Sequence, residues 1–152
     1  MAPGKGFTLI EVMIVLVIVA VLATTITLQI SHRNDGEEQV ERLRLVLEAT
    51  AERAAIRGTP LAVDFVPQGY RISQFDMRDA WTPVHGEALF ADQSVPELTW
   101  TGLTVDGQAM PLHLVFGSEM PAFVLRIEAR GSEAVLAGQP NGAVLRLVRS
   151  AH

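Results

Sequence analysis

The sequence has no cysteine in its 152 residues, which excludes several kinds of site at once. Without cysteine there is no disulfide framework, no thiolate nucleophile and no zinc site with cysteine ligands. Lysine and arginine are also few, 12 against 17 aspartate and glutamate residues, so the formal net charge is −5. No run of basic residues offsets this balance. The chain is therefore a poor candidate for binding nucleic acid by neutralising phosphates.

Signatures of catalytic and metal sites are missing as well. The histidines show no HExxH or comparable ligand spacing; they are His32, His85, His113 and His152. No G-x-S-x-G elbow presents a nucleophile, and no cluster of glycines forms a phosphate cradle. We therefore expect no enzyme, no cofactor and no catalytic residue. His113 alternates with leucines, and we expect it to face outward from a strand or to form a hydrogen bond.

Acidic residues gather in an irregular stretch at residues 76–96, and calcium binding there stays open as an alternative. The carboxylates are Asp76, Asp79, Glu87 and Asp92. They lack the alternating ligand order of an EF-hand, so a solvated acidic loop is the favoured interpretation and no metal is predicted.

The most apolar segment lies near the N-terminus, at residues 7–30. Val12 to Ala23 is unbroken apolar sequence, and about 20 apolar residues are enough for a helix to cross a bilayer. Lys5 and the amino terminus precede the segment, whereas acidic residues follow it soon after. By the positive-inside rule the first residues are cytoplasmic and the remainder is exported. The sequence thus predicts a single transmembrane helix.

Two ordinary interpretations of this segment explain only part of it. A conventional signal peptide would be cut after Val21-Leu22-Ala23, so that the mature chain would begin at Thr24. A plain signal anchor would explain the length but not Glu11. A carboxylate in an apolar run costs roughly 2.5–3.5 kcal/mol near a bilayer centre, and less near the end where Glu11 stands.

The sequence Gly6-Phe7-Thr8-Leu9-Ile10-Glu11 resembles the processing site of type IV prepilins and type II secretion pseudopilins. The resemblance implies that a prepilin peptidase cuts after Gly6 and methylates Phe7. It also implies that Glu11 compensates the N-terminal amine of a neighbouring subunit in a filament. Such a pair is physically sensible, because each charge alone is costly in an apolar bundle.

A second helical pattern follows a polar break at Ser31–Gly36. Apolar residues recur every three or four positions, which is typical of an amphipathic helix. The positions expected to face a core are Val40, Leu43, Leu47, Thr50 or Ala51, and Ala54. Gly58 and Pro60 end the pattern. Whether the helix continues through the break, which contains Asn34, Asp35 and Gly36, stays open.

Beyond residue 60 the pattern becomes β. Alternating or apolar runs bounded by turn residues predict strands; they cover residues 61–65, 70–72, 98–105, 112–116, 123–128, 134–137 and 143–149. Asp106-Gly107 and Asn141-Gly142 predict turns between neighbouring strands, and residues 76–96 predict a long loop. A long N-terminal helix packed on an antiparallel sheet is an α+β fold.

The downstream order extends the resemblance to a narrower group. The helix end leads into Leu61–Phe65 and Gly69–Ile72, with Trp81 and Leu114–Ile127 following. This order is similar to the H-type minor pseudopilins of type II secretion, and it implies a pilin-like fold. The implied parts are a prepilin leader (1–6), a transmembrane and filament-core helix (7–30), its amphipathic continuation (31–58) and a periplasmic β-rich domain (59–152).

The resemblance implies a structural subunit that helps assemble the tip of a pseudopilus and supports export across the outer membrane. It implies a single-pass inner-membrane location with a cytoplasmic N-terminus, then a periplasmic pseudopilus. The implied partners are other minor and major pseudopilins, the prepilin peptidase, the inner-membrane assembly platform and, before assembly, inner-membrane lipid. No nucleic-acid partner is expected.

Two other functions stay open. One is a minor pilin of a type IV pilus linked to DNA uptake, for which the sequence offers a local basic patch; its members would be Arg126, Arg130, Arg146 and Arg149. The other is a periplasmic binding protein or enzyme released by ordinary signal peptidase.

Aromatic residues are the remaining candidates for a functional surface. Packing alone would place Trp100 in a strand core and Trp81 against the long loop. Interfaces favour aromatic anchors, and long irregular loops are often functional. Trp81 and Phe90 are therefore the predicted subunit-interface aromatics.

Overall fold

A computed structural model describes the backbone of residues 8–148 and the side chains of residues 8–21 and 35–147. The chain divides into two units, Met1–Asp35 and Gly36–His152. Gly6, Phe7 and Arg149, which carry predictions above, lie outside the described residues, as do the side chains of residues 22–34.

The first described element is the helix α1 (Leu9–Arg57), which includes residues of both units. Its backbone is helical through the polar residues 31–36, so the helix continues where the sequence left a break open. In the first unit the described side chains of residues 9–21 are exposed. Within the described part of the chain, no helix has the length and apolarity needed to cross a membrane. The transmembrane helix predicted over residues 7–30 includes residues outside the described part of the chain, and it stays a prediction.

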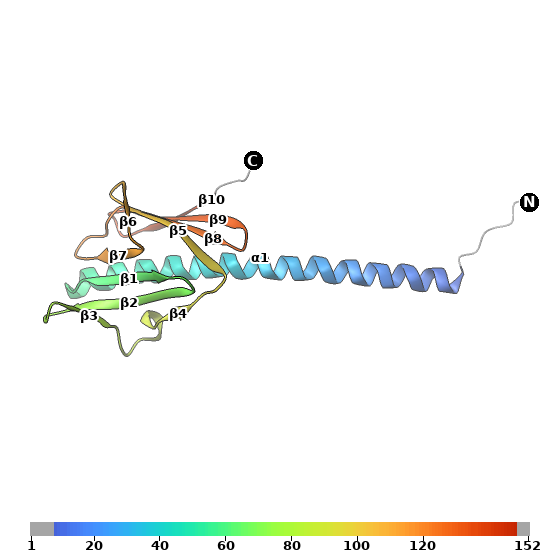
Figure 1. Cartoon of the computed structure of the whole chain (residues 1–152), viewed down its shortest axis with the longest axis horizontal. Helices are drawn as coiled ribbons and strands as arrows, with labels where there is room; N and C mark the ends of the chain where they lie inside the picture. Colours follow the sequence, from blue (N-terminus) through green and yellow to red (C-terminus); the bar gives the residue numbers. More distant parts are fainter. Residues whose placement is uncertain (1–7, 149–152) are drawn as a thin grey trace, which may run out of the picture. The chain divides into compact units, whose positions relative to one another are not determined.

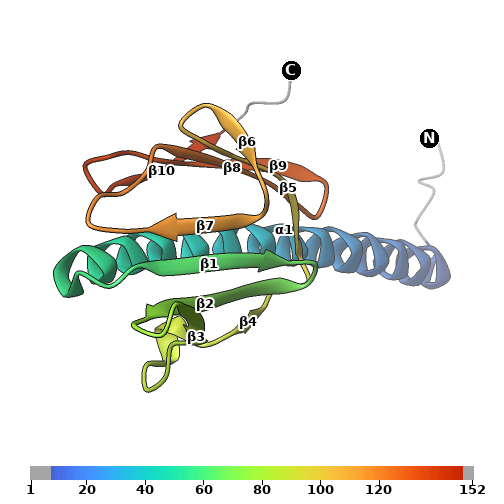
Figure 2. The ribbon, with the colours of Figure 1, turned by 60° about the vertical axis from the view of Figure 1, so that its left-hand side comes forward.

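The second unit consists of the end of α1 and two antiparallel sheets (Figures 1 and 2). One sheet has the order β3-β2-β1-β7, with β4 also paired to β2, and the other has the order β10-β9-β8-β5-β6. The elements of the first sheet are β1 (Leu61–Val66), β2 (Gly69–Asp76), β3 (Ala80–Pro83), β4 (Gln93–Ser94) and β7 (His113–Phe116). Those of the second are β5 (Leu98–Val105), β6 (Gln108–Met110), β8 (Phe123–Ala129), β9 (Ser132–Gly138) and β10 (Val144–Val148). A short 3-10 helix, η1 (Ala88–Phe90), precedes β4.

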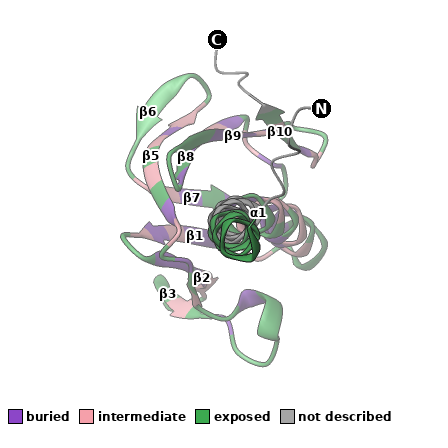
Figure 3. Ribbon diagram, turned by 90° about the vertical axis from the view of Figure 1, so that its right-hand side faces the viewer, coloured by how far each residue is buried: buried purple, intermediate pink, exposed green. Residues whose placement is uncertain are grey.

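A single apolar core joins the end of α1 to both sheets. Every helix position expected to face a core is buried, including both alternatives Thr50 and Ala51, and the sequence pattern missed only Val46 among the buried apolar residues of this part of the helix. In a view along α1, buried stretches of both sheets lie around the helix (Figure 3). The α+β fold and its helix–sheet packing are therefore confirmed.

The buried hydroxyl of Thr50 shows how this face of the helix accepts a polar residue. Thr50 Oγ1 donates a hydrogen bond to the carbonyl oxygen of Val46 at 2.7 Å, one turn earlier. A buried hydroxyl without such a bond would be costly. The apolar stripe can therefore include a threonine without leaving a polar atom unsatisfied.

Two details of the β region differ from the sequence prediction. Asp106-Gly107 does form a tight turn, with φ angles of 50° and 81°, and such left-handed values suit a two-residue hairpin. The turn leads, however, into the extra strand β6, while β7 pairs with β1 in the other sheet. The predicted loop at residues 76–96 also contains β3, η1 and β4. These elements have four residues or fewer, too short to produce a recognisable alternation.

The helix also contacts β10 through polar groups. The backbone N–H of Val144 donates to Glu48 Oε1 at 2.9 Å, and Arg44 Nη1 donates to the same oxygen at 2.8 Å. Arg44 lies 3.4 Å from the carbonyl oxygen of Val144 as well. Its hydrogen bond to Glu41 lowers the pKa of that carboxyl group. One turn of α1 thus fixes the start of β10.

Burial raises the pKa of Tyr70, and Arg42 lowers it by less. Tyr70 is the only tyrosine, so we expect the absorbance at 295 nm of the folded chain to titrate with a midpoint above the ordinary value of about 10. The unfolded chain ionises first, so the free energy of unfolding falls as pH rises through that value. The loss should be absent in Tyr70→Phe. A midpoint at the ordinary value in the folded chain would contradict this expectation.

Candidate functional site

The predicted processing site is described from Thr8 onward. Glu11 lies in the first turn of α1, where its backbone N–H donates to the Thr8 carbonyl oxygen at 3.0 Å. Its side chain is exposed, and no ion pair joins it to another described residue. A carboxylate in the first turn is favoured by the helix dipole. Glu11 is thus placed where an amine from outside the chain can reach it, while Gly6 and Phe7 lie outside the described residues.

Trp81 lies in a polar and aromatic cluster on the first sheet. Its ring centroid is 5.2 Å from that of Phe75 and 5.6 Å from that of His113, and both contacts are edge-to-face. His113 Nδ1 lies 2.5 Å from Asp64 Oδ1 across the β1–β7 pair. Trp81 remains 39% exposed. The interface role predicted for Trp81 stays a prediction, but the ring is accessible for it.

Sequence reasoning missed that Asp64 and His113 lie close to Trp81. His113 does form a hydrogen bond and is only partly buried, as its alternation predicted. The signal for Asp64 was a carboxylate inside an otherwise apolar strand. Their proximity depends on the pairing of β1 with β7, which are far apart in sequence, and no local pattern predicts such pairing.

Phe90, the second predicted interface aromatic, occupies a different environment. It is only 4% exposed, and the Arg53 guanidinium lies 4.7 Å from its ring centroid. Glu87 forms an ion pair with Arg53. Together with the last turns of α1 these residues line a shallow, open depression. Because its ring is covered, Phe90 offers little surface to a neighbouring subunit, and Trp81 is the better placed of the two.

Trp100 joins the two sheets. Its ring packs 4.9 Å from that of Phe65, measured between centroids. Its indole N–H points at the carbonyl oxygens of Val66 and Gly69, at 2.6 and 3.1 Å. This partly buried, bonded indole matches the packing role expected for a strand residue.

The acidic stretch does not assemble into a cation site within the described part of the chain, where no group of three or more histidine or acidic residues could hold a metal ion. Instead, Asp92 lies 3.7 Å from Arg71. Glu87 faces Arg53 and Arg57.

The arginines considered for DNA binding point in different directions. Arg130 pairs with Glu97 at 3.5 Å, and Arg146 pairs with Glu37 at 3.9 Å. Arg126 is exposed and lies on the same face of its sheet as Leu147. Arg146 is the neighbour of Leu147 in β10, so its side chain projects from the opposite face. The three described arginines therefore form no common basic patch.

Comparison with known proteins agrees with this geometry. Residues 1–27 match the family model described as the prokaryotic N-terminal methylation motif. Over 157 residues, the chain is 27% identical to the type II secretion system protein H of Pseudomonas aeruginosa, covering 88% of each. The protein of the same name from Escherichia coli is 29% identical over 97 residues, which covers 59% of this chain and 56% of the relative.

The fold matches the crystal structure of EpsH, the minor pseudopilin from the type II secretion system of Vibrio cholerae. The TM-score is 0.63 at 15% identity, over 78% of this chain and 97% of EpsH. A second EpsH structure gives 0.62 at 14% identity, over 78% and 99%. The chain is therefore similar to H-type minor pseudopilins in both sequence and fold. The resemblance predicted from the leader and the strand order is thereby confirmed, and the pilin-like fold with it.

Proposed function

We propose that this pseudopilin is a structural subunit of the type II secretion pseudopilus that helps assemble its tip and so supports export across the outer membrane. The observation that carries the proposal is the combination of two parts in one chain. A prepilin-type N-terminus with an accessible Glu11 precedes a β-rich domain with the EpsH fold. The first part suits polymerisation and the second suits recognition of neighbouring subunits.

The proposed mechanism is assembly without catalysis. The apolar segment at residues 7–30 holds the subunit in the inner membrane after the prepilin peptidase has cut behind Gly6. On extraction by the assembly platform, the same segment packs among the helices of other pseudopilins. Removing exposed apolar side chains from water favours that packing.

Glu11 gives this packing a defined register in the proposed mechanism. The cleaved chain begins at Phe7 with a charged amine, which is costly to bury without a partner. Glu11 of a neighbouring subunit supplies the opposite charge, so a shift of the helices along each other would leave both charges uncompensated. The minor pilin of a type IV pilus shares this chemistry, but the separated arginines give no support for DNA uptake.

The substitution Glu11→Ala tests this function. We expect cleavage after Gly6 to continue, so that intact-mass analysis finds a mature chain beginning at methylated Phe7. We expect incorporation into sheared pseudopili to fall about tenfold or more, because an unpaired buried charge costs several kcal/mol. The matched control is Glu38→Ala, which removes an exposed carboxylate from the same helix and should leave incorporation unchanged.

Two results would contradict the proposal. Normal incorporation and secretion by Glu11→Ala would remove the assembly role of Glu11. A mature chain that begins at Thr24 would show release by ordinary signal peptidase, and a filament subunit would then be excluded.

A further inference from the structure

The register of the first sheet puts Trp81 on its outer face, which is the face that points away from the core, and the ring extends across that face. Trp81 on β3 lies opposite Phe75 on β2, whereas His113 lies opposite Asp64 on the far side of β1. Neighbouring strands are about 4.8 Å apart, so the ring contact between Trp81 and His113 bridges the two strands between β3 and β7.

Small residues lie between these two rings. Ala62 and Ser73 are paired with each other and share the face of Asp64 and Phe75. Ala62 is 0% exposed although its side chain points away from the core face. Ser73 Oγ is buried and has no hydrogen-bond partner in the described part of the chain. The indole therefore covers this strip and is held at both ends, by Phe75 and by His113.

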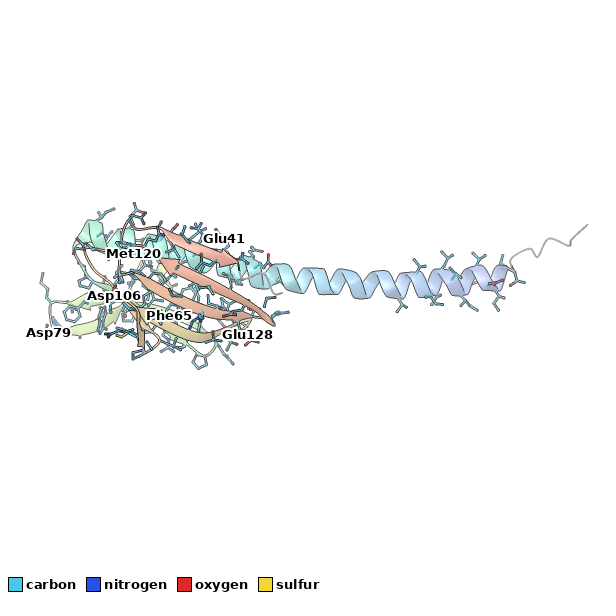
Figure 4. The ribbon with its side chains drawn as sticks, turned by 90° about the horizontal axis from the view of Figure 1, so that it is seen from above. Glu41, Phe65, Asp79, Asp106, Met120 and Glu128 are labelled. Carbon is cyan, nitrogen blue, oxygen red and sulfur yellow. The ribbon has the colours of Figure 1, made fainter. Side chains whose placement is uncertain are left out.

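The fixed indole has carboxylates around it. His113 uses only Oδ1 of Asp64, whose side chain is 42% exposed. The β2–β3 hairpin that carries Trp81 adds Asp76 and Asp79, and Asp79 lies at its tip (Figure 4). Arg71 lies opposite Asp64 in the β1–β2 pair and 3.7 Å from Asp92, and Arg78 is the other arginine of this region; against Asp64, Asp76, Asp79 and Asp92 these two cations leave an acidic excess. An exposed aromatic ring beside carboxylates attracts a cation.

Elsewhere in the same chain an aromatic ring, a cation and a carboxylate already lie together. Arg53 lies over the ring of Phe90 and forms an ion pair with Glu87. At Trp81 the aromatic ring and the carboxylate are present, and no arginine or lysine of the described chain lies over the ring. The missing component is a cation from outside.

We propose that the face formed by Trp81, His113 and Asp64 docks a lysine or arginine side chain of a neighbouring pseudopilin. This inference rests on the proposed function, because it assumes a filament neighbour. The partner residue stacks on the indole and pairs with Asp64, while Met77 at the hairpin tip, fully exposed, contacts apolar surface beside it. The contacts with the indole and with Asp64 depend on groups that the fold holds rigidly, which lowers the entropic cost of binding.

The test is photo-crosslinking of the full chain in cells that assemble the pseudopilus. Benzoylphenylalanine at Met77 should give an adduct with another pseudopilin, and the crosslinked peptide should contain a lysine or arginine. Trp81→Leu keeps the strip covered but removes the π face, and Asp64→Asn removes the charge. Each should lower the yield of the adduct about fivefold or more, as expected for roughly 1 kcal/mol or more of lost binding. Trp81→Phe keeps an aromatic ring, so it should lower the yield by less.

Controls separate this proposal from the proposed function and from misfolding. Leu147→Ala, on the other sheet and 49% exposed, should leave the adduct unchanged. Tryptophan fluorescence of each purified variant shows whether it is folded, from Trp100 alone in the Trp81 variants and from both tryptophans in the others. The same photoreactive group at Leu16, exposed on α1, reports incorporation independently. Adducts from Leu16 with none from Met77, or a Met77 adduct indifferent to Trp81→Leu, would overturn the docking surface alone. No adduct from either position would overturn the proposed function too.

Discussion

Replacing Leu47 with alanine is expected to lower the free energy of unfolding by about 2–5 kcal/mol. Leu47 is 0% exposed on the face of α1 that packs into the core of the second unit. The shorter side chain removes buried apolar surface and leaves a cavity that the surrounding sheets cannot fully close. Urea unfolding of the full chain in detergent, followed by the fluorescence of Trp81 and Trp100, measures the change.

Leu45→Ala is the matched control for this prediction. It makes the same chemical change two residues away on the same helix, but Leu45 is 51% exposed. We expect a change of about 0.5 kcal/mol or less. Equal losses in the two variants would mean that the packing of α1 on the sheets does not stabilise the domain.

Replacing Gly69 with alanine should have an effect of comparable size through overpacking. A Cβ at this position would lie 1.9 Å from the carbonyl oxygen of Gln93 and 3.2 Å from Cα of Ser94. Both are backbone atoms, so relief requires β4 to move away from β2. The cost is about 1–3 kcal/mol or more, together with strain on the hydrogen bond from Trp100 to the Gly69 carbonyl oxygen.

Hydrogen exchange distinguishes this local effect from general unfolding. The backbone N–H of Val95 donates to the Gln68 carbonyl oxygen at 2.8 Å, and it should exchange faster in Gly69→Ala than in the parent chain. Gly117→Ala is the control, because a Cβ there meets nothing within 4 Å. Unchanged exchange and stability in Gly69→Ala would show that the close approach of β4 is not maintained in solution.

The elements that could be predicted from the sequence were those with a strong local signal. The buried face of α1 followed from helical spacing, and the run at Phe123–Ala129 followed from strict alternation. Val46 was missed because it widens the apolar stripe beyond the spacing used. The short elements β3 and β4 depend on contacts with β2, which no short window of sequence contains.

The residues of the candidate site could also be predicted only where the sequence carries a local signal. Trp81 stood out by its residue type, and Glu11 by its place in an apolar run. Asp64 and His113 could not be joined to Trp81 beforehand, because β1 and β7 meet across about fifty residues of intervening chain, as the bond from His113 to Asp64 shows. The burial of Phe90 beneath Arg53 likewise depends on tertiary packing.

The bonds from Arg44 and Glu48 to the backbone of Val144 have a consequence for polymerisation. An unpaired strand edge invites strand-to-strand association, which has no fixed stoichiometry and is difficult to reverse. Here the subunit's own helix occupies the hydrogen-bonding groups at the start of β10. A growing filament therefore cannot add a strand at Val144, and any contact between subunits at that point is made by side chains and can be broken when the filament is taken apart.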